Sequence, residues 1–364
     1  MAPEIHSKPF TDETQDKLKI IKAYFIDAIP VFLQHSYFHH LIIGDLFSGP
    51  GTDTDGNDGT PLIILRALWS HREKLERSSC SVSVIFNDNK KAKTQSLHLL
   101  TQEWDQIIPR VSIEIFNEDA EDLFSTLQPR LRAPNTGSIL CLDQYGIDFV
   151  NKQRFRALLG TSHCDTIFFL ASSYVRRFSV DFAPRFDIPP DIASVCQPHQ
   201  VHDLVCSSYE KLIPSSIEAY VSRYKIHKKS NNYGLVFLTH SLLGLEKFVK
   251  ICWRTDQNSG SANNGKSHIL DESLGSLFEP EEVPTDKYRQ FVKELRDHIE
   301  SQAIVTEKDV MIFTYKRGML TNHANDVVKE LQAKGHLHPK IQVRSSSSTV
   351  KKEDPVFLKG GNHG

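Results

Sequence analysis

Short apolar segments alternate with helical patterns over residues 41–170, and no other feature of the sequence restricts the fold as strongly. Apolar residues dominate the segments that we expect to be strands, at 41–43, 82–86, 111–116, 138–142, 166–170 and 233–239. Helical spacing fills intervals between them, at 61–69, 90–104 and 120–127. This alternation predicts an α/β fold with a doubly wound, mostly parallel sheet and helices on both faces. Ligands of such sheets bind at the carboxyl ends of the strands.

The size of the chain indicates more than one domain. Its 364 residues correspond to two or three domains at roughly 100–200 residues each. Hydrophobic residues make up 39% and charged residues 24%, which is typical of a globular protein. Because Lys and Arg number 43 against 45 Asp and Glu, the whole chain has no basic excess, and a nucleic-acid surface would have to be local.

Cysteine spacing and the N-terminus predict where the protein works. The six cysteines form no C-x-x-C pair, which argues against a zinc site and a disulfide framework and favours a reducing compartment. The first ten residues lack the apolar stretch of a secretory signal, and no segment approaches the ~20 apolar residues that cross a bilayer. We therefore expect a cytoplasmic protein with no membrane partner.

Composition changes divide the chain into four parts. We expect the α/β domain over 1–255, with a polar, helix-rich stretch at 176–232 as a helical insertion. Asn, Gly and Ser residues at the start of 256–284 predict a linker. Helical patterns at 287–302, 307–316 and 322–335, followed by a hairpin, predict a winged helix-turn-helix over 285–343. The tail, 344–364, is expected to be mobile.

The most specific motif follows the first predicted strand and reads Asp45-x-Phe47-x-Gly49-x-Gly51. Glycines there permit positive φ and close approach of a ligand, while a carboxylate at the strand end accepts hydrogen bonds from an amine or hydroxyl. The spacing matches neither the dinucleotide fingerprint nor the phosphate loop of nucleotide hydrolases. The alternative is an ordinary junction between strand and helix.

A second motif, Asp143-Gln144-Tyr145-Gly146, follows the fourth predicted strand. Asp143 can accept a hydrogen bond from a planar amine on which Tyr145 stacks, so these two are the candidate catalytic residues. The alternative is a strand-end turn in which Asp143 satisfies backbone amides and Tyr145 packs.

Polar residues after two further strands are weaker candidates. Asn87 and Asp88 can bind ribose hydroxyls or form a surface turn. Asp119 can contact an adenine amine or cap the helix that begins near residue 120. The acidic loop 51–59 lacks the pattern of a calcium loop, so we predict no metal site and interpret the loop as solvated; its carboxylates are Asp53, Asp55 and Asp58.

With these motifs in view, the chain resembles the three-Cys-motif partner protein family (TcmP), a bacterial family. Residues 45–51 and 59–62 look like the family's D-L-F-A-G-P-G and G-S-P-L segments, and 143–146 looks like its D-P-Y-G. The resemblance implies a Rossmann-like fold of the class I methyltransferase type, which depends on S-adenosylmethionine. It also implies a neighbouring three-cysteine, radical-S-adenosylmethionine-like protein as partner. Two positions depart from the family pattern: Asn87 replaces an acid and Gln144 replaces proline.

The resemblance also implies roles for the motif residues. S-adenosylmethionine would lie over Gly49 and Gly51, beside Phe47, with Asp45 at its amino-acid end. Asp88 or Asn87 would meet its ribose and Asp119 its adenine, while Asp143 and Tyr145 would orient the methyl acceptor.

Two functions from different classes follow. The first is a methyltransferase whose acceptor is a nucleic-acid base delivered by the winged helix. The second is a non-catalytic DNA-binding or docking module with a degenerate methyltransferase fold. The second assigns phosphate contacts to basic residues of the C-terminal domain: Lys316, Arg317, Lys329 and Lys334.

Overall fold

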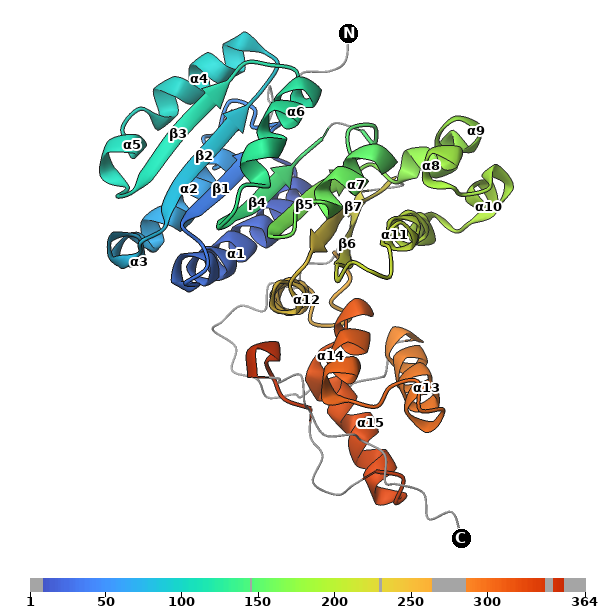
Figure 1. The fold of residues 1–364 in the computed structure, drawn as a ribbon. Helices are drawn as coiled ribbons and strands as arrows, with labels where there is room; N and C mark the ends of the chain where they lie inside the picture. Colours follow the sequence, from blue (N-terminus) through green and yellow to red (C-terminus); the bar gives the residue numbers. More distant parts are fainter. Residues whose placement is uncertain (1–8, 145, 229–230, 264–285, 338–342, 350–364) are drawn as a thin grey trace, which may run out of the picture. The chain divides into compact units, whose positions relative to one another are not determined.

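The structure is a computed structural model, and it describes residues 9–144, 146–228, 231–263, 286–337 and 343–349 (Figure 1). The chain divides into two compact units, residues 1–247 and 248–364.

The first unit is built on a seven-stranded, mostly parallel sheet. Its strands follow the order β3-β2-β1-β4-β5-β7-β6, in which the first five are parallel and β7 is antiparallel to both of its neighbours. The strands are β1 (His40–Asp45), β2 (Ser81–Asn87), β3 (Val111–Phe116), β4 (Thr136–Leu142), β5 (Cys164–Leu170), β6 (Tyr220–Lys228) and β7 (Asn231–Thr239). The predicted doubly wound α/β sheet is confirmed, and it agrees with the class I methyltransferase-like fold that the resemblance implies.

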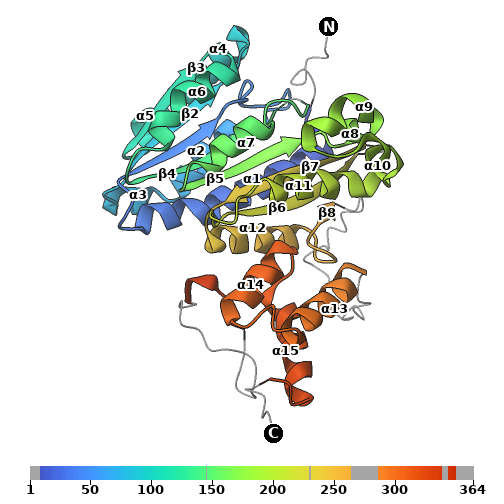
Figure 2. The same ribbon diagram turned by 45° about the vertical axis from the view of Figure 1, so that its right-hand side comes forward.

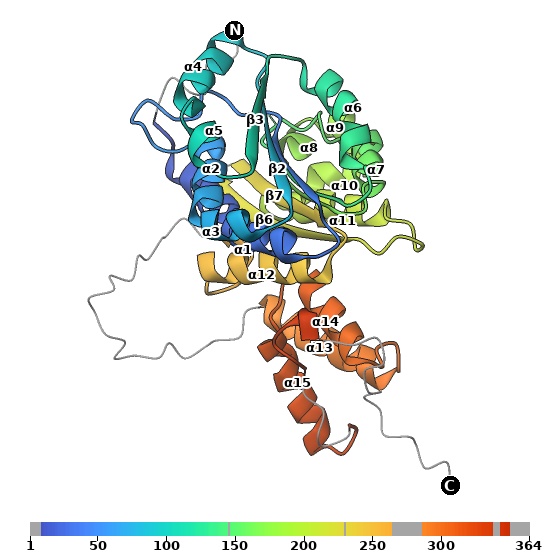
Figure 3. The same ribbon diagram turned by 60° about the vertical axis from the view of Figure 1, so that its left-hand side comes forward.

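Helices cover both faces of this sheet, as Figure 3 shows from its edge. Helices α2 to α5 lie on one face and α6 and α7 on the other. The second face carries a continuous apolar core in which Leu123 and Phe155, from α6 and α7, pack with Ile42 and Leu140 of the central strands. The helices are α1 (Asp12–Gln34), α2 (Thr60–Ser70), α3 (Arg72–Arg77), α4 (Lys91–Thr101), α5 (Trp104–Ile107), α6 (Ala120–Leu131) and α7 (Lys152–Leu159).

Strand register brings three strand ends together. Asp45, the last residue of β1, lies opposite Phe86 of β2 and Cys141 of β4. All seven residues of β4 are buried, which explains why its sequence is apolar without alternation. The polar residues that follow β1, β2 and β4 therefore share one edge of the sheet.

The segment between β5 and β7 differs in part from the sequence expectation. Short helices come first and group beyond the carboxyl end of β5 (Figure 2). They are α8 (Ser173–Arg177), α9 (Ser179–Phe182), η1 (Ala183–Phe186), α10 (Pro190–Val195), η2 (Pro198–Gln200) and α11 (Val201–Lys211). The rest of the expected insertion 176–232 contains β6, which the sequence analysis did not identify as a strand.

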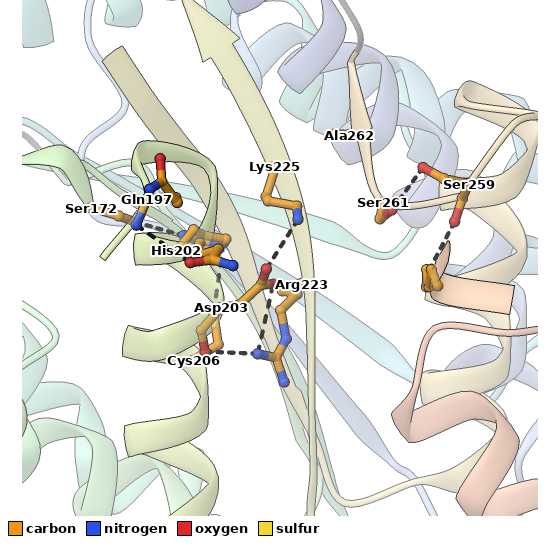
Figure 4. A network of polar contacts seen from close by, with 12 residues as sticks. Ser172, Gln197, His202, Asp203, Cys206, Arg223, Lys225, Ser259, Ser261 and Ala262 are labelled. Atoms are coloured by element: carbon orange, nitrogen blue, oxygen red, sulfur yellow. Dashed lines mark hydrogen bonds and ion pairs between the residues drawn. The ribbon is translucent and has the colours of Figure 1, made fainter. Parts of the chain in front are cut away.

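Two charged residues make β6 difficult to recognise as a strand from the sequence. Arg223 and Lys225 point toward α11 in Figure 4, where they meet carboxylates rather than solvent. Lys225 Nζ donates to Asp203 Oδ2 at 3.0 Å, and Arg223 forms an ion pair with Glu210. Their partners make these charges compatible with a strand that packs on a helix.

A buried histidine joins α11 to the end of β5 and to β7 (Figure 4). Ser172 Oγ and His202 Nδ1 are 2.6 Å apart, and His202 Nε2 lies 3.2 Å from the carbonyl oxygen of Leu235. Because that carbonyl only accepts, Nε2 carries the proton and the Ser172 hydroxyl donates to Nδ1. Burial lowers the pKa of His202 to about 4, so the imidazole is neutral at pH 7. A methyl group on Gly234 would overlap this ring.

The second unit begins inside α12 (Leu242–Thr255), and its described residues contain three further α-helices. These are α13 (Asp286–Glu300), α14 (Glu307–Lys316) and α15 (Thr321–Ala333), close to the helices predicted from sequence, with β8 (Ala262–Asn263) before them and η3 (Ser347–Thr349) after them. Residues 317–320, with Gly318 at φ +63°, form the short turn that joins α14 to α15.

Several sequence predictions lie partly outside the described residues. The expected wing falls mostly on 338–342, the linker continues over 264–284 and the tail over 350–364, and the structure describes none of these. The start of the expected linker is a turn around Asp256, which accepts hydrogen bonds from the Asn258 backbone and the Ser259 hydroxyl. Over the described parts of the chain, no helix combines the length and apolar character needed to cross a membrane.

Candidate functional site

The glycine-rich turn after β1 is fastened to the end of β2. Gly49 and Gly51 have φ of +65° and +95°, as the motif predicts. Ser48 N donates to the Asn87 carbonyl at 2.8 Å, and Gly49 N donates to Asp88 Oδ2 at 3.2 Å. A Cβ on Gly51 would lie 2.6 Å from Leu100 Cδ2, so close packing against α4 also requires glycine there. The turn therefore keeps one shape at the carboxyl edge of the sheet.

Asp45 is a buried carboxyl group with one unsatisfied oxygen. Its Oδ1 accepts a hydrogen bond from Phe47 N at 3.0 Å, whereas no residue that the structure describes bonds to its buried Oδ2. Burial raises the pKa of Asp45 to about 8; the Phe47 amide and Lys17 oppose this rise, while Asp143 and Asp88 add to it. A buried polar atom without a partner is costly, so this oxygen indicates a ligand.

Asp143 lies close enough to influence Asp45 and is paired with a lysine that sequence analysis missed. Lys17 of α1 forms an ion pair with Asp143, and its ammonium lies 4.9 Å from the centre of the Phe169 ring. Lys17 is itself almost fully buried. The position of Lys17 on the apolar face of α1, with Ile21 and Tyr24, was the available signal, because a buried lysine needs a partner.

Gln144, which replaces the proline of the family pattern, points into the protein. Its Nε2 donates to the Phe169 carbonyl at 2.9 Å, and its Oε1 accepts from Val150 N at 3.1 Å. The glutamine thus fixes the turn by hydrogen bonds where a proline would fix it by its ring. Tyr145, the candidate stacking residue, lies outside the described residues.

Asn87 and Asp88 have different surroundings. Asn87 is buried, and its side chain spans two loops: Nδ2 donates to the Leu46 and Glu118 carbonyls, and Oδ1 accepts from Glu118 N. Asp88 accepts from the Lys90 backbone amide at 2.9 Å and lies 3.3 Å from Lys93 Nζ. The side chain of Asn87 therefore bonds to backbone groups, whereas Asp88 also forms an ion pair with Lys93.

Two further candidates have structural contacts. Asp119 is exposed and caps α6 by accepting from Glu121 N at 2.8 Å, the alternative that the sequence left open. Phe47 is half-buried and packs edge-on against Phe149, with ring centres 4.9 Å apart. Asp119 therefore caps a helix, and Phe47 packs against the apolar core.

The loop 51–59 closes on itself beside the site. Gly59 N donates to the Gly51 carbonyl at 2.8 Å. Asp53 accepts from Asn57 N and Phe10 N at 2.8 and 2.7 Å, so it ties the N-terminal segment to the loop. Asp58 pairs with Arg66. Within the described ranges, no three His, Cys, Asp or Glu residues are grouped as metal ligands.

Two of the four basic candidates of the second unit form ion pairs with glutamates, and the other two are exposed. Arg317 Nε is 2.6 Å from Glu294 Oε2, and Lys334 Nζ is 2.7 Å from Glu330 Oε1. Lys316 and Lys329 are exposed on α14 and α15. Because ion pairs reduce the charge available to phosphate, Lys316 and Lys329 are the stronger candidates.

Comparison with known proteins gives matches to solved structures alone. No family model and no curated protein sequence matches the chain. A complex of Trm1 from Pyrococcus horikoshii with S-adenosyl-L-methionine overlaps 82% of this chain and 89% of its own, at 12% identity and a TM-score of 0.43. An rRNA methylase from Streptococcus thermophilus overlaps 58% of this chain and 93% of its own, at 11% identity and a TM-score of 0.29.

Proposed function

We propose that this chain is an S-adenosylmethionine-dependent methyltransferase. The observation that carries the proposal is the unsatisfied, buried Oδ2 of Asp45, beside a glycine turn at the carboxyl edge of a parallel sheet. Asp45, the backbone of Gly49 and Gly51, and Asp88 would hold the cofactor. Its cationic ammonium and sulfonium groups suit an edge at which Asp45, Asp88 and Asp143 gather.

When bound, S-adenosylmethionine supplies an electrophilic methyl group. The residues of the chain would supply orientation, since methyl transfer from a sulfonium depends mainly on in-line positioning in a polar, water-poor pocket. Asp143 is the acceptor-orienting group in this proposal, and Lys17 holds its carboxylate in place. An amine acceptor that hydrogen-bonds to Asp143 shares that carboxylate with Lys17.

Isothermal titration with S-adenosylmethionine and S-adenosylhomocysteine tests the proposal. We expect saturable binding that Asp45→Asn weakens at least tenfold, because a bound cation favours ionisation of the Asp45 carboxyl group, whereas an amide cannot ionise. Asp55→Asn is the matched control: it makes the same change at an exposed carboxylate of the neighbouring loop and should leave affinity unchanged. Absence of binding to folded wild-type protein would refute the proposal, and full binding by Asp45→Asn would refute the role of Asp45.

We also propose, from the resemblance and from the α14–α15 turn, that the acceptor is nucleic acid and that a three-Cys-motif protein is the partner. Lys329 would contact phosphate, so Lys329→Glu should weaken binding of a DNA or RNA duplex and flatten its dependence on salt. Lys74→Glu, an exposed lysine of α3, serves as the control. A salt-independent affinity, or equal loss in both variants, would favour the docking function without nucleic acid.

A further inference from the structure

A cavity lies at the opposite edge of the same sheet from Asp45. Its volume is about 610 Å³, within the range of small-molecule sites. It borders the start of β5, at Asp165, and lies near the end of the antiparallel β7, at Thr239, rather than the carboxyl ends of β1 and β4. The second half of α1 and the first turn of α12 complete its walls, including Ala28 and Gly244. Nothing in the proposed methyl transfer uses this space.

Aromatic rings form one wall of this cavity. His35, Tyr37, Phe38 and His163 contact one another in pairs, with ring centres between 5.1 and 6.4 Å apart. Tyr37 is 42% exposed, so this wall reaches solvent. Burial, and the neighbouring His35, lower the pKa of His163, which keeps its ring neutral at pH 7. The wall thus offers a flat π surface to a planar ligand.

A carboxylate lies at the inner end of the cavity. Asp165 is buried and accepts hydrogen bonds from two hydroxyl groups, Tyr24 Oη at 2.6 Å and Thr239 Oγ1 at 2.5 Å. No lysine, arginine or histidine in the described parts of the chain forms an ion pair with it. Burial raises the pKa of Asp165 to about 6, against these two hydrogen bonds, so it is mostly ionised at pH 7. A carboxylate that lines a cavity without a counter-cation favours a cationic ligand.

Lys247, which also lines the cavity, is the charge that opposes this preference. Its side chain is half-buried, and it is not among the residues that determine the pKa of Asp165. Lys247 can turn toward solvent, as lysine side chains at the edge of apolar surfaces do. The choice between a cationic and an anionic ligand is therefore a choice between Asp165 and Lys247, and the buried, fixed group is Asp165.

We propose that this cavity is a second binding site, specific for a planar aromatic ring that carries an alkylammonium group. The ammonium group would bind Asp165, and the ring would lie against the wall of His35, Tyr37, Phe38 and His163. The ammonium group and the ring of one ligand would then each contact a complementary part of the cavity. The site is independent of the proposed methyltransferase site.

Titration of the full-length chain with tryptamine tests this site. We expect saturable binding near 1 mM or tighter, on the order of a fragment-sized ligand. Indole, which lacks the ammonium, and indole-3-acetate, which reverses the charge, should each bind at least tenfold more weakly. Tighter binding of indole-3-acetate than of tryptamine would overturn the proposal, because it would identify Lys247 as the recognition group.

Three variants of cavity residues and one control variant locate the binding. Asp165→Asn should weaken tryptamine at least tenfold, and Val31→Trp, which fills the cavity from a half-buried position on α1, should abolish binding. Lys247→Ala should retain or tighten it. Asp45→Asn, at the other edge of the sheet, should have no effect. If Asp165→Asn unfolds, Val31→Trp and Lys247→Ala still decide the matter: wild-type affinity in Val31→Trp refutes the site, and loss of affinity in Lys247→Ala refutes its charge preference.

Discussion

The buried carboxyl of Asp45 should make stability depend on pH. Its pKa rises from 3.8 to about 8 on folding, so its contribution is most favourable below pH 4 and falls as the pH rises toward 8. The loss is up to roughly 1.4 kcal/mol per pH unit. Asp45→Asn removes this cost and keeps the acceptor for Phe47 N. We expect thermal unfolding of the ligand-free chain to show little effect of the variant at pH 4.5 and marked stabilisation at pH 8. The same difference in midpoint between variant and wild type at both pH values would contradict the raised pKa.

Individual strand-end residues show what spacing can and cannot predict. The positions of Asp45, Asp88 and Asp143 at one edge follow from the strand pattern, since parallel strands end together. The roles of Asn87 and Gln144 did not follow, because an amide that bonds to backbone and one that faces a ligand look alike in sequence. Lys17 lies 126 residues from Asp143 along the chain, and only the folded sheet brings them together.

The contact between Gly234 and His202 gives a prediction of the opposite sign. Gly234→Ala places a methyl group in the space of the His202 ring, so we expect a loss of about 2 kcal/mol or more. The double variant Gly234→Ala, His202→Ala should lose less than the sum of the two single changes, because the clash disappears with the ring. A double-mutant cycle by denaturant unfolding measures this. Additive losses would show that the ring does not exclude the methyl group.

At the scale of elements, the helices of the second unit and the central strands were easier to predict from the sequence than strand β6. Helices α13, α14 and α15 carry their pattern in local sequence, and Thr306 and Asp309 mark the start of α14 with a capping box. Strand β6 was missed because its sequence includes Arg223 and Lys225, and such charged residues are typical of a solvated segment. Their carboxylate partners lie on α11, and no local pattern reveals that pairing.

The pairing of α11 with β6 predicts that Arg223 stabilises the fold more than an ordinary surface charge. Arg223 is mostly buried, donates to the Asp203 carbonyl at 2.9 Å and pairs with Glu210. Arg223→Met leaves these acceptors without their donor and should cost about 2 kcal/mol. Lys19→Met is the control, since Lys19 forms an exposed pair with Asp16. Similar unfolding midpoints for the two variants would contradict the stabilising role of the α11–β6 contact.

At the scale of the whole molecule, each unit contains its own apolar core. The first is built around Leu140, and the second around residues such as Leu295 of α13, both fully shielded from solvent. The sequence predicted two bodies but placed the boundary at 255, in a polar segment, whereas the division falls after residue 247, inside α12. A helix shared by two units shows no change of composition at their boundary, so sequence cannot locate it.

Separate cores predict two thermal transitions in the full-length chain, of which only one responds to cofactor. A saturating ligand of the first unit stabilises it by RT ln(1 + [L]/Kd), about 2.7 kcal/mol at 100 times Kd. In differential scanning calorimetry, S-adenosylmethionine should therefore raise the temperature of one transition and leave that of the other unchanged. Leu140→Ala and Leu295→Ala assign them, because each deletes a buried side chain from one core and should lower one transition alone. A single transition that shifts as a whole, or that both variants lower equally, would show instead that the two units unfold as one cooperative body.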